Sequence, residues 1–294
     1  MRGGIASLAF ATLAAFVAAS RQAVAELPQR IVSLNMCTDQ LLVDLVDRER
    51  IAAVSFLATD RTLSANAAKL QGLKRVRGTA EEVLALKPDL VIAGEFTTGP
   101  TVDLLKRLGV NVLVVPLASD FEGMKDTLRT IARAAGVPER AEELIAEFDE
   151  RLSEARSMVA ARPSAIAYQV NSLASGSGTL LDAVLEAAGF RNIARDIKLG
   201  PAGRLPLGEL VAAPPDLIVV ANAPNDFKTV LADNLRHPAF SRLLEKRPHV
   251  HLPMALWMCA TPRIADAVAL LASMKRTGVA MTHGTPAPAP RTTP

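Results

Sequence analysis

The sequence predicts an α/β fold of two lobes, each with a mostly parallel sheet, joined by one long α-helix. Twice in the chain, a short helical segment meets a proline and continues directly into an apolar strand. The first copy runs from Glu81 to Ala93, and the second, 127 residues later, runs from Gly208 to Val220. Proline ends a helix, and a strand that is apolar on both faces is typical of a parallel sheet. Two such units in opposite halves of the chain indicate two similar lobes with a cleft between them.

Composition limits the kinds of protein that this chain can be. Half of its 294 residues are hydrophobic and only 4% are aromatic, so two cores would be built mainly from leucine, valine, isoleucine and alanine. The formal charge of +3 is spread along the chain, with no basic stripe that carries interleaved aromatic side chains. Such a stripe is the usual footprint of a nucleic-acid-binding protein, so we expect no nucleic-acid partner.

Residues 1–25 have the organisation of a cleavable signal peptide. Arg2 supplies the positive charge, residues 5–19 form an apolar run, and residues 23–25 (Ala-Val-Ala) offer a cleavage site. The apolar run is too short to span a membrane comfortably. No cysteine stands at the cleavage point, so we expect no lipid anchor. The prediction is therefore an exported, soluble periplasmic protein whose mature chain begins at Glu26.

Strand and helix signals alternate along both halves, which predicts parallel sheets with right-handed crossovers. Between Pro138 and Ala160, apolar side chains recur at three- and four-residue steps, as they do along one face of a long helix. We therefore predict an N-terminal lobe at 26–136, a linking helix at 137–161, a C-terminal lobe at 162–280 and a disordered tail at 281–294. The predicted strands cover 30–34, 51–56, 91–93, 110–115, 165–170, 217–221 and 250–252.

In open α/β sheets, ligands bind in the loops beyond the carboxyl ends of the strands. Six predicted loops of this kind are rich in amide, hydroxyl and sulfur-bearing side chains, and aromatic side chains add apolar surface. They span 35–39, 57–61, 95–98, 171–177, 222–226 and 255–261. This mixture suits a bulky, partly polar small molecule. The candidate ligand-binding residues are Asn35, Met36, Cys37, Thr38, Phe96, Asn171, Ser172, Asn222, Trp257, Met258 and Cys259.

Cys37 and Cys259 are the only cysteines, and they stand in the first and the last of these loops. We expect them to lie near each other across the mouth of the cleft. In an oxidising compartment they could form a disulfide, but they could also remain free thiols or bind a soft metal. A permanent bridge is the less expected outcome, because a staple across the mouth would oppose access of the ligand.

The sequence contains no pattern that indicates catalysis or a resident metal. It lacks the G-x-S-x-G, H-E-x-x-H and P-loop motifs. His249 and His251 share one face of a predicted strand, an arrangement that is more often a partly exposed face than a metal site. Tyr168, the only tyrosine, is assigned to the core, whereas Trp257, the only tryptophan, could contact ligand or be buried. We therefore predict no catalytic residue, no metal site and no cofactor.

The motif from Glu81 to Ala93 (EEVLALKPDLVIA) follows a first strand with the sequence RIVSL and an acidic, leucine-rich helix. Together these segments resemble the periplasmic binding proteins for ferric siderophores, haem and cobalamin, and the resemblance covers about residues 30–275. It implies two lobes joined by a rigid helix, with modest opening and closing. It also implies that a non-enzymatic, monomeric protein delivers a metal chelate or corrinoid to the permease of an ABC importer in the inner membrane.

In that family, a surface glutamate on each lobe docks against arginines of the permease. Glu81 stands at the matching position of the first lobe, whereas the second lobe has Gly208 there and Glu209 one residue later. The resemblance thus implies docking through Glu81, with Glu209 as the nearest second candidate. On the residues alone, Glu81 is explained more simply as a carboxylate that the helix dipole favours. The alternative function is a periplasmic enzyme that processes a chelate on the same two-lobed scaffold.

Overall fold

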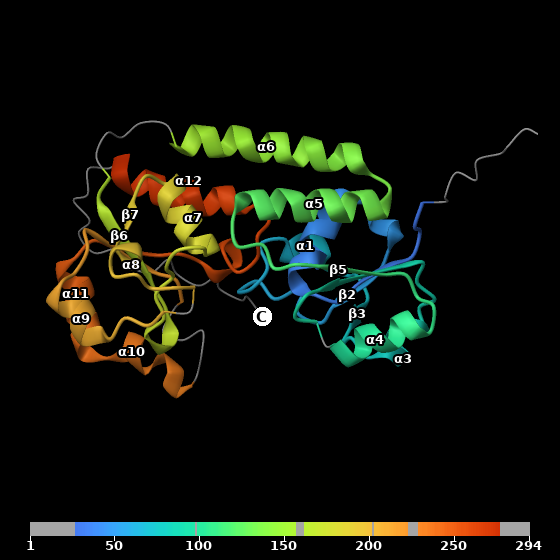
Figure 1. Cartoon of the computed structure of the whole chain (residues 1–294), viewed down its shortest axis with the longest axis horizontal. Coiled ribbons are helices and arrows are strands. Elements are labelled where there is room, and N and C mark those ends of the chain that lie inside the picture. The colour runs from blue at the N-terminus through green and yellow to red at the C-terminus, as the bar shows by residue number, and fades with distance from the viewer. Residues whose placement is uncertain (1–26, 98, 157–161, 202, 223–228, 277–294) are drawn as a thin grey trace, which may run out of the picture.

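The computed structural model describes residues 27–97, 99–156, 162–201, 203–222 and 229–276. Figure 1 shows two α/β lobes side by side, with the long helix α6 (Pro138–Arg156) running along one side of both. The predicted two-lobed α/β fold with parallel sheets is confirmed. In the described part of the chain, no helix is both long and apolar enough to cross a membrane. The predicted signal peptide and the predicted tail lie outside the described residues.

The N-terminal lobe contains a five-stranded parallel sheet with the order β3-β2-β1-β4-β5. Its strands are β1 (Ile31–Ser33), β2 (Ile51–Ser55), β3 (Arg75–Val76), β4 (Leu90–Gly94) and β5 (Val112–Val115). The helices are α1 (Met36–Leu45), α2 (Ala67–Leu70), α3 (Ala80–Leu84), α4 (Gly99–Arg107) and α5 (Phe121–Ala135), with a 3₁₀ turn, η1, at Arg48–Arg50.

Alternation of side chains along the strands decides which helices cover which face of this sheet. Ile31 and Ile92 pack in a cluster with α1, α5 and the first half of α6. Val32 and Val91, one position away, pack in a second cluster with α3 and α4. Because both faces are buried, the strands read as continuous apolar runs in the sequence.

The C-terminal lobe contains a four-stranded parallel sheet with the order β7-β6-β8-β9. Its strands are β6 (Ser164–Tyr168), β7 (Arg191–Asn192), β8 (Leu217–Val220) and β9 (His249–His251). One face packs against α7 (Leu180–Ala187) and α12 (Ile264–Arg276), and the other against α8 (Ile193–Asp196), α9 (Leu207–Ala212), α10 (Asp233–Arg236) and α11 (Pro238–Lys246). Three 3₁₀ turns, η2 (Val170–Ser172), η3 (Val230–Ala232) and η4 (Met254–Leu256), connect these elements.

The repeated Pro-Asp motif has the same structural role in both lobes. Asp89 accepts hydrogen bonds from the backbone N–H groups of Gln29 (2.7 Å) and Arg30 (3.0 Å), immediately before β1. Asp216 accepts hydrogen bonds from the N–H (2.8 Å) and the hydroxyl (2.7 Å) of Ser164, the first residue of β6. The bonds from Ser164 hold the pKa of Asp216 below its usual value. Asp89 precedes β4 and fixes the start of its neighbour β1, and Asp216 precedes β8 and fixes the start of its neighbour β6.

Two helices, rather than one, connect the cores of the two lobes. In α6, Ile145 packs in the N-terminal core and Phe148 packs in the C-terminal core. The sequence analysis assigned no helix at α5, yet this helix also contributes to both cores. Ion pairs between Arg129 and Glu142 (2.8 Å) and between Lys125 and Asp149 (2.7 Å) join α5 to α6. The connection between the lobes is therefore stiffer than a single helix would make it.

Several predicted boundaries are wrong in detail. Helix α1 begins at Met36, so residues 36–39, predicted as a loop, form its first turn. The two-residue strands β3 and β7 were not predicted, because they are too short to show a periodic pattern. The helix α4 ends at Arg107, shortly before Gly109, which has a φ of +79° and lies in the left-handed region that favours glycine.

Candidate functional site

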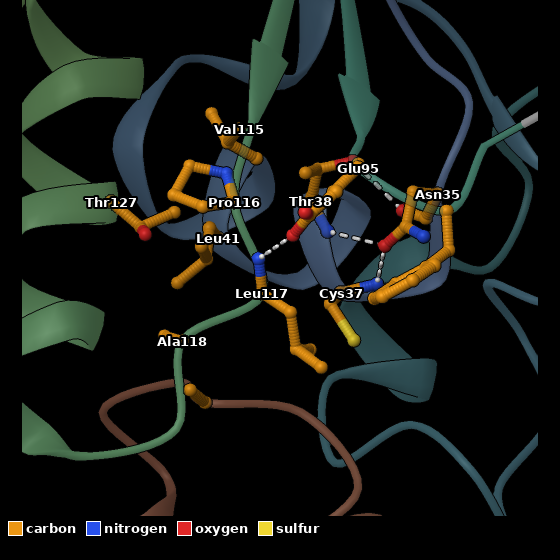
Figure 2. A pocket seen from close by; sticks show the side chains of 13 residues that line it. Asn35, Cys37, Thr38, Leu41, Glu95, Val115, Pro116, Leu117, Ala118 and Thr127 are labelled. Atoms are coloured by element: carbon orange, nitrogen blue, oxygen red, sulfur yellow. Dashed lines mark hydrogen bonds between the residues drawn. The ribbon is translucent and has the colours of Figure 1, made fainter. Parts of the chain in front are cut away.

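The carboxyl ends of β1, β4 and β5 meet the C-terminal lobe at a small hollow, shown in Figure 2. The first turn of α1 and the loops after β4 and β5 form its wall in the N-terminal lobe, and Ala260 lines it from the C-terminal lobe. Open α/β sheets bind ligands at this edge. Its lining includes the predicted site residues Asn35, Cys37, Thr38 and Phe96.

Asn35 begins α1 and shapes the hollow. Its side-chain oxygen accepts hydrogen bonds from the backbone N–H groups of Cys37 (2.8 Å) and Thr38 (3.4 Å), which Figure 2 shows as dashed lines. The neighbouring Gly94 leaves room for this side chain, because a Cβ there would lie only 2.9 Å from Nδ2 of Asn35. Neither Gly94 nor its contact with Asn35 was part of the predicted site, because only the fold brings the ends of β1 and β4 together.

The loops after β4 and β5 add one carboxylate and two exposed apolar side chains. Glu95 Oε2 accepts a hydrogen bond from the backbone N–H of Leu117 (3.2 Å), so the two loops hold each other in place. Phe96 is 77% exposed and Leu117 is 59% exposed. Large apolar side chains that remain this exposed beside a hollow often mark a binding surface. Phe96 was a predicted site residue, whereas Glu95 and Leu117 were not.

Two polar groups lie deeper around the hollow. Thr127, on α5, lines the hollow, and its hydroxyl is buried with no hydrogen-bond partner among the residues that the structure describes. Asp39, behind the first turn of α1, is fully buried and accepts hydrogen bonds from the N–H and the hydroxyl of Ser55. Burial raises the pKa of Asp39 to about 6, although hydrogen bonds from Ser33 and Ser55 act in the opposite direction.

A disulfide joins Cys37 to Cys259. The expectation that the two cysteines would more readily remain unbridged is therefore wrong. The expected proximity of the two residues is confirmed, since their Cα atoms are 5.1 Å apart. The bridge does not cross an open mouth. Cys259 is buried and the next residue, Ala260, belongs to the C-terminal core, so the disulfide lies against the packed junction of the lobes.

In the C-terminal lobe, Asn171 and Ser172 form a tight turn after β6. Both have positive φ values, 58° and 56°, and the hydroxyl of Tyr168 donates a hydrogen bond to Ser172 Oγ (3.1 Å). Tyr168 is completely buried, as predicted. Asn222, also buried, accepts a hydrogen bond from the N–H of Val170 (3.2 Å). This asparagine therefore has a structural role in holding the turn, whether or not it contacts a ligand.

Trp257 and Met258 follow η4 and are both half-buried. The indole N–H of Trp257 donates a hydrogen bond to the backbone oxygen of Ala221 (3.1 Å), and its ring packs against the C-terminal core. Met36 is half-buried in the first turn of α1. None of these three residues lines the hollow of Figure 2, although all lie within two residues of the disulfide that borders it.

The two candidate docking residues lie away from this hollow. Glu81 is exposed in the first turn of α3, and Glu209 is exposed in the first turn of α9. In Figure 1, α3 and α9 belong to opposite lobes and lie on the side away from α6. Within the described residues, no group of three or more His, Cys, Asp or Glu side chains is arranged to hold a metal ion.

Comparisons with known proteins agree with this architecture. A family described as periplasmic binding protein matches residues 31–244. The chain is 28% identical over 197 residues to a cobalamin-binding protein of Halobacterium salinarum, covering 65% of this chain and 53% of that protein. It is 30% identical over 147 residues to a vitamin B12-binding protein of Salmonella choleraesuis, covering 48% of this chain and 54% of that protein. The chain thus spans about half the length of the curated relatives it matches.

Solved structures of similar fold include a periplasmic heme-binding protein of Pseudomonas aeruginosa. That protein is 25% identical to this chain, with a TM-score of 0.68, and the match covers 88% of this chain and 96% of the other. Because the family match extends over most of both lobes and the fold agrees with it, the chain belongs to the periplasmic binding protein family.

Proposed function

We propose that this protein is a solute-binding protein that captures a small metal chelate, of the ferric siderophore, haem or cobalamin type, and delivers it to an ABC importer. The supporting observation is the hollow where the strand ends of one lobe meet the other lobe, at the edge where α/β sheets bind ligands. The names of its relatives support a chelate as the ligand. The proposal includes export to the periplasm through a cleaved signal peptide and action as a monomer.

The proposed ligand surface joins both lobes at the disulfide. Asn35, Thr38 and Phe96 would contact the ligand from the N-terminal lobe. The residues proposed to contact it from the C-terminal lobe are Asn171, Ser172, Asn222, Trp257 and Met258. Exposed apolar side chains supply contact area, and a few polar groups fix orientation, as is usual for small-molecule sites.

The direct test is a titration of the mature protein with a panel of chelates, followed by tryptophan fluorescence. Trp257 is the only tryptophan, so any change in emission reports on the region beside the disulfide. We expect one chelate to bind at micromolar affinity or tighter and to change the emission. Binding without any change in emission, together with unaltered affinity of Trp257→Ala, would remove Trp257 from the site. The ligand should be recovered unchanged, whereas a modified ligand would favour the alternative of a chelate-processing enzyme.

Delivery to a permease is tested through the two exposed glutamates. Charge pairs between these carboxylates and permease arginines would be desolvated on docking, so loss of one partner should be costly. Glu81→Ala and Glu209→Ala should each weaken uptake in cells while ligand affinity stays the same. Glu150→Ala is a matched control, because Glu150 is also an exposed carboxylate, on α6. Normal uptake in the Glu81→Ala, Glu209→Ala double variant would disprove the docking assignment.

A further inference from the structure

We propose that the hollow of Figure 2 is a side pocket for one short, neutral branch of the ligand that ends in an amide, and that Thr127 recognises this branch. The inference rests on the proposed function and concerns how the site selects among chelates. It follows from the volume of the hollow, from an unpaired hydroxyl group at its floor, and from the charge of its lining.

The hollow is too small to hold a whole chelate. Its volume is about 70 Å³, whereas pockets that enclose a small organic ligand usually measure about 300 to 1,000 Å³. Water occupies about 30 Å³ per molecule in the liquid, so the hollow has room for about two waters or for a branch of about four non-hydrogen atoms. The body of the ligand would therefore lie outside it, over the exposed side chains of Phe96 and Leu117 at its mouth.

The floor of the hollow combines apolar side chains with one unpaired hydroxyl group. Leu41, Val115 and Thr127 line the hollow and are buried, Thr127 being only 6% exposed. In Figure 2, the side chain of Thr127 extends from α5 toward Leu41 and Pro116. A threonine hydroxyl in a helix often bonds to the carbonyl oxygen four residues earlier, but that of Thr127 has no partner among the described residues. Because a buried hydroxyl without a partner is costly, Thr127 is placed to bond with a group that enters the hollow.

Three interactions hold the walls of the hollow in place. Asn35 accepts a hydrogen bond from the N–H of Cys37 (2.8 Å) and so fixes the first turn of α1. Glu95 accepts one from the N–H of Leu117 (3.2 Å) and so joins the loops after β4 and β5. The disulfide between Cys37 and Cys259 holds the turn of α1 against the C-terminal lobe. Walls held in this way resist expansion, so the hollow should select the branch by its size and shape.

The lining favours a neutral branch that ends in an amide. Among the described residues that line the hollow, only Glu95 carries a charge, and its side chain is exposed. This carboxylate repels an anionic branch, and a cationic branch would lose its water on the apolar floor without an opposite charge beside it. The hydroxyl of Thr127 and Nδ2 of Asn35 are both hydrogen-bond donors, and neither has an acceptor among the described residues. The carbonyl oxygen of an amide is a neutral acceptor for such donors.

The test is an NMR titration of the disulfide-bonded protein with acetamide, acetate and ethylammonium, followed by the chemical shifts of Thr127 and Leu41. Acetamide should bind in the millimolar range, and the two charged probes of similar size should bind at least about tenfold more weakly. Thr127→Val, which keeps the shape but removes the hydroxyl, should weaken acetamide binding about fivefold, as expected for one neutral hydrogen bond. Thr127→Ser should stay within about twofold of the wild type, because it keeps the hydroxyl. Thr127→Val should be at least as stable as the wild type, since it removes an unpaired buried hydroxyl.

The outcomes separate this inference from the proposed function. Equal affinity of Thr127→Val and the wild type for acetamide would overturn the inference, and so would tighter binding of acetate or ethylammonium. A chelate that changes Trp257 emission should displace acetamide and bind Thr127→Val about fivefold more weakly. A chelate that leaves acetamide in place and binds Thr127→Val with unaltered affinity would overturn the inference but leave the chelate-binding function intact. Acetamide binding as predicted, with no chelate of the panel bound, would support the side pocket and overturn the chelate-binding function.

Discussion

Removing the disulfide should destabilise the protein substantially, because the bridge closes a very long loop. Cys37 and Cys259 are 222 residues apart in the sequence. In the chain-entropy treatment, closing a loop of this length removes unfolded-state entropy worth about 5 kcal/mol at 25 °C. Residual structure in the unfolded chain reduces this value, so the Cys37→Ser, Cys259→Ser double variant should lose about 2 to 5 kcal/mol.

Urea unfolding of the oxidised protein and of the double variant measures this loss. The double variant should show a lower midpoint and a somewhat larger dependence on urea, because its unfolded chain is less compact. Wild-type protein treated with a reductant is the matched control and should behave like the double variant. Thiol counting on the unfolded, oxidised protein should find no reactive thiol. Two reactive thiols would show that the disulfide is absent. A loss of unfolding free energy below about 1 kcal/mol would show that the disulfide does not constrain the unfolded chain.

Substitutions at three further positions test the local interactions. The pKa of Asp39 is raised to about 6, above the unfolded value, so ionisation of this buried group should reduce stability as pH rises from about 4 to about 6. Asp39→Asn should reduce the fall in the free energy of unfolding across this pH range by up to about 3 kcal/mol. An unchanged dependence on pH would show that the carboxyl is not buried. Asp216→Ala should cost about 1 to 3 kcal/mol in the same assay, because it leaves polar groups at the start of β6 unpaired, whereas Asp216→Asn should cost less. Gly94→Ala should displace the Asn35 side chain and weaken chelate binding by about tenfold, or about 1.4 kcal/mol, in a titration; unaltered affinity would remove Asn35 from the site.

The parts of the fold that were predictable are those with a local signal. The helix-proline-strand units at Glu81–Ala93 and Gly208–Val220 carry their own pattern, and the aspartate of each has the same role in both lobes. Helix α5 also carried a signal that the sequence analysis did not use. Asp120 caps its start through the N–H of Gly123, and Gly136 ends it with a φ of +73°.

The site was less predictable because it depends on residues that are distant in the sequence. The sequence analysis predicted a loop at the first turn of α1, although Asn35 is a favourable helix cap. The partnership of Asn35 with Gly94, and that of Glu95 with Leu117, arise only when parallel strands place their carboxyl ends together. Whether two cysteines pair is likewise decided by the distance between their Cα atoms, which no local pattern gives.

The central claim, that a chelate binds where the two lobes meet, is tested most directly by hydrogen exchange on the disulfide-bonded protein with and without bound chelate. We expect slower exchange at the backbone amides of Cys37, Thr38 and Leu117 in the N-terminal lobe and of Asn171 and Ser172 in the C-terminal lobe. Protection confined to one lobe would contradict the claim. Protection at the separate surface hollow beside α9 and α11, with no change around the hollow of Figure 2, would also contradict it.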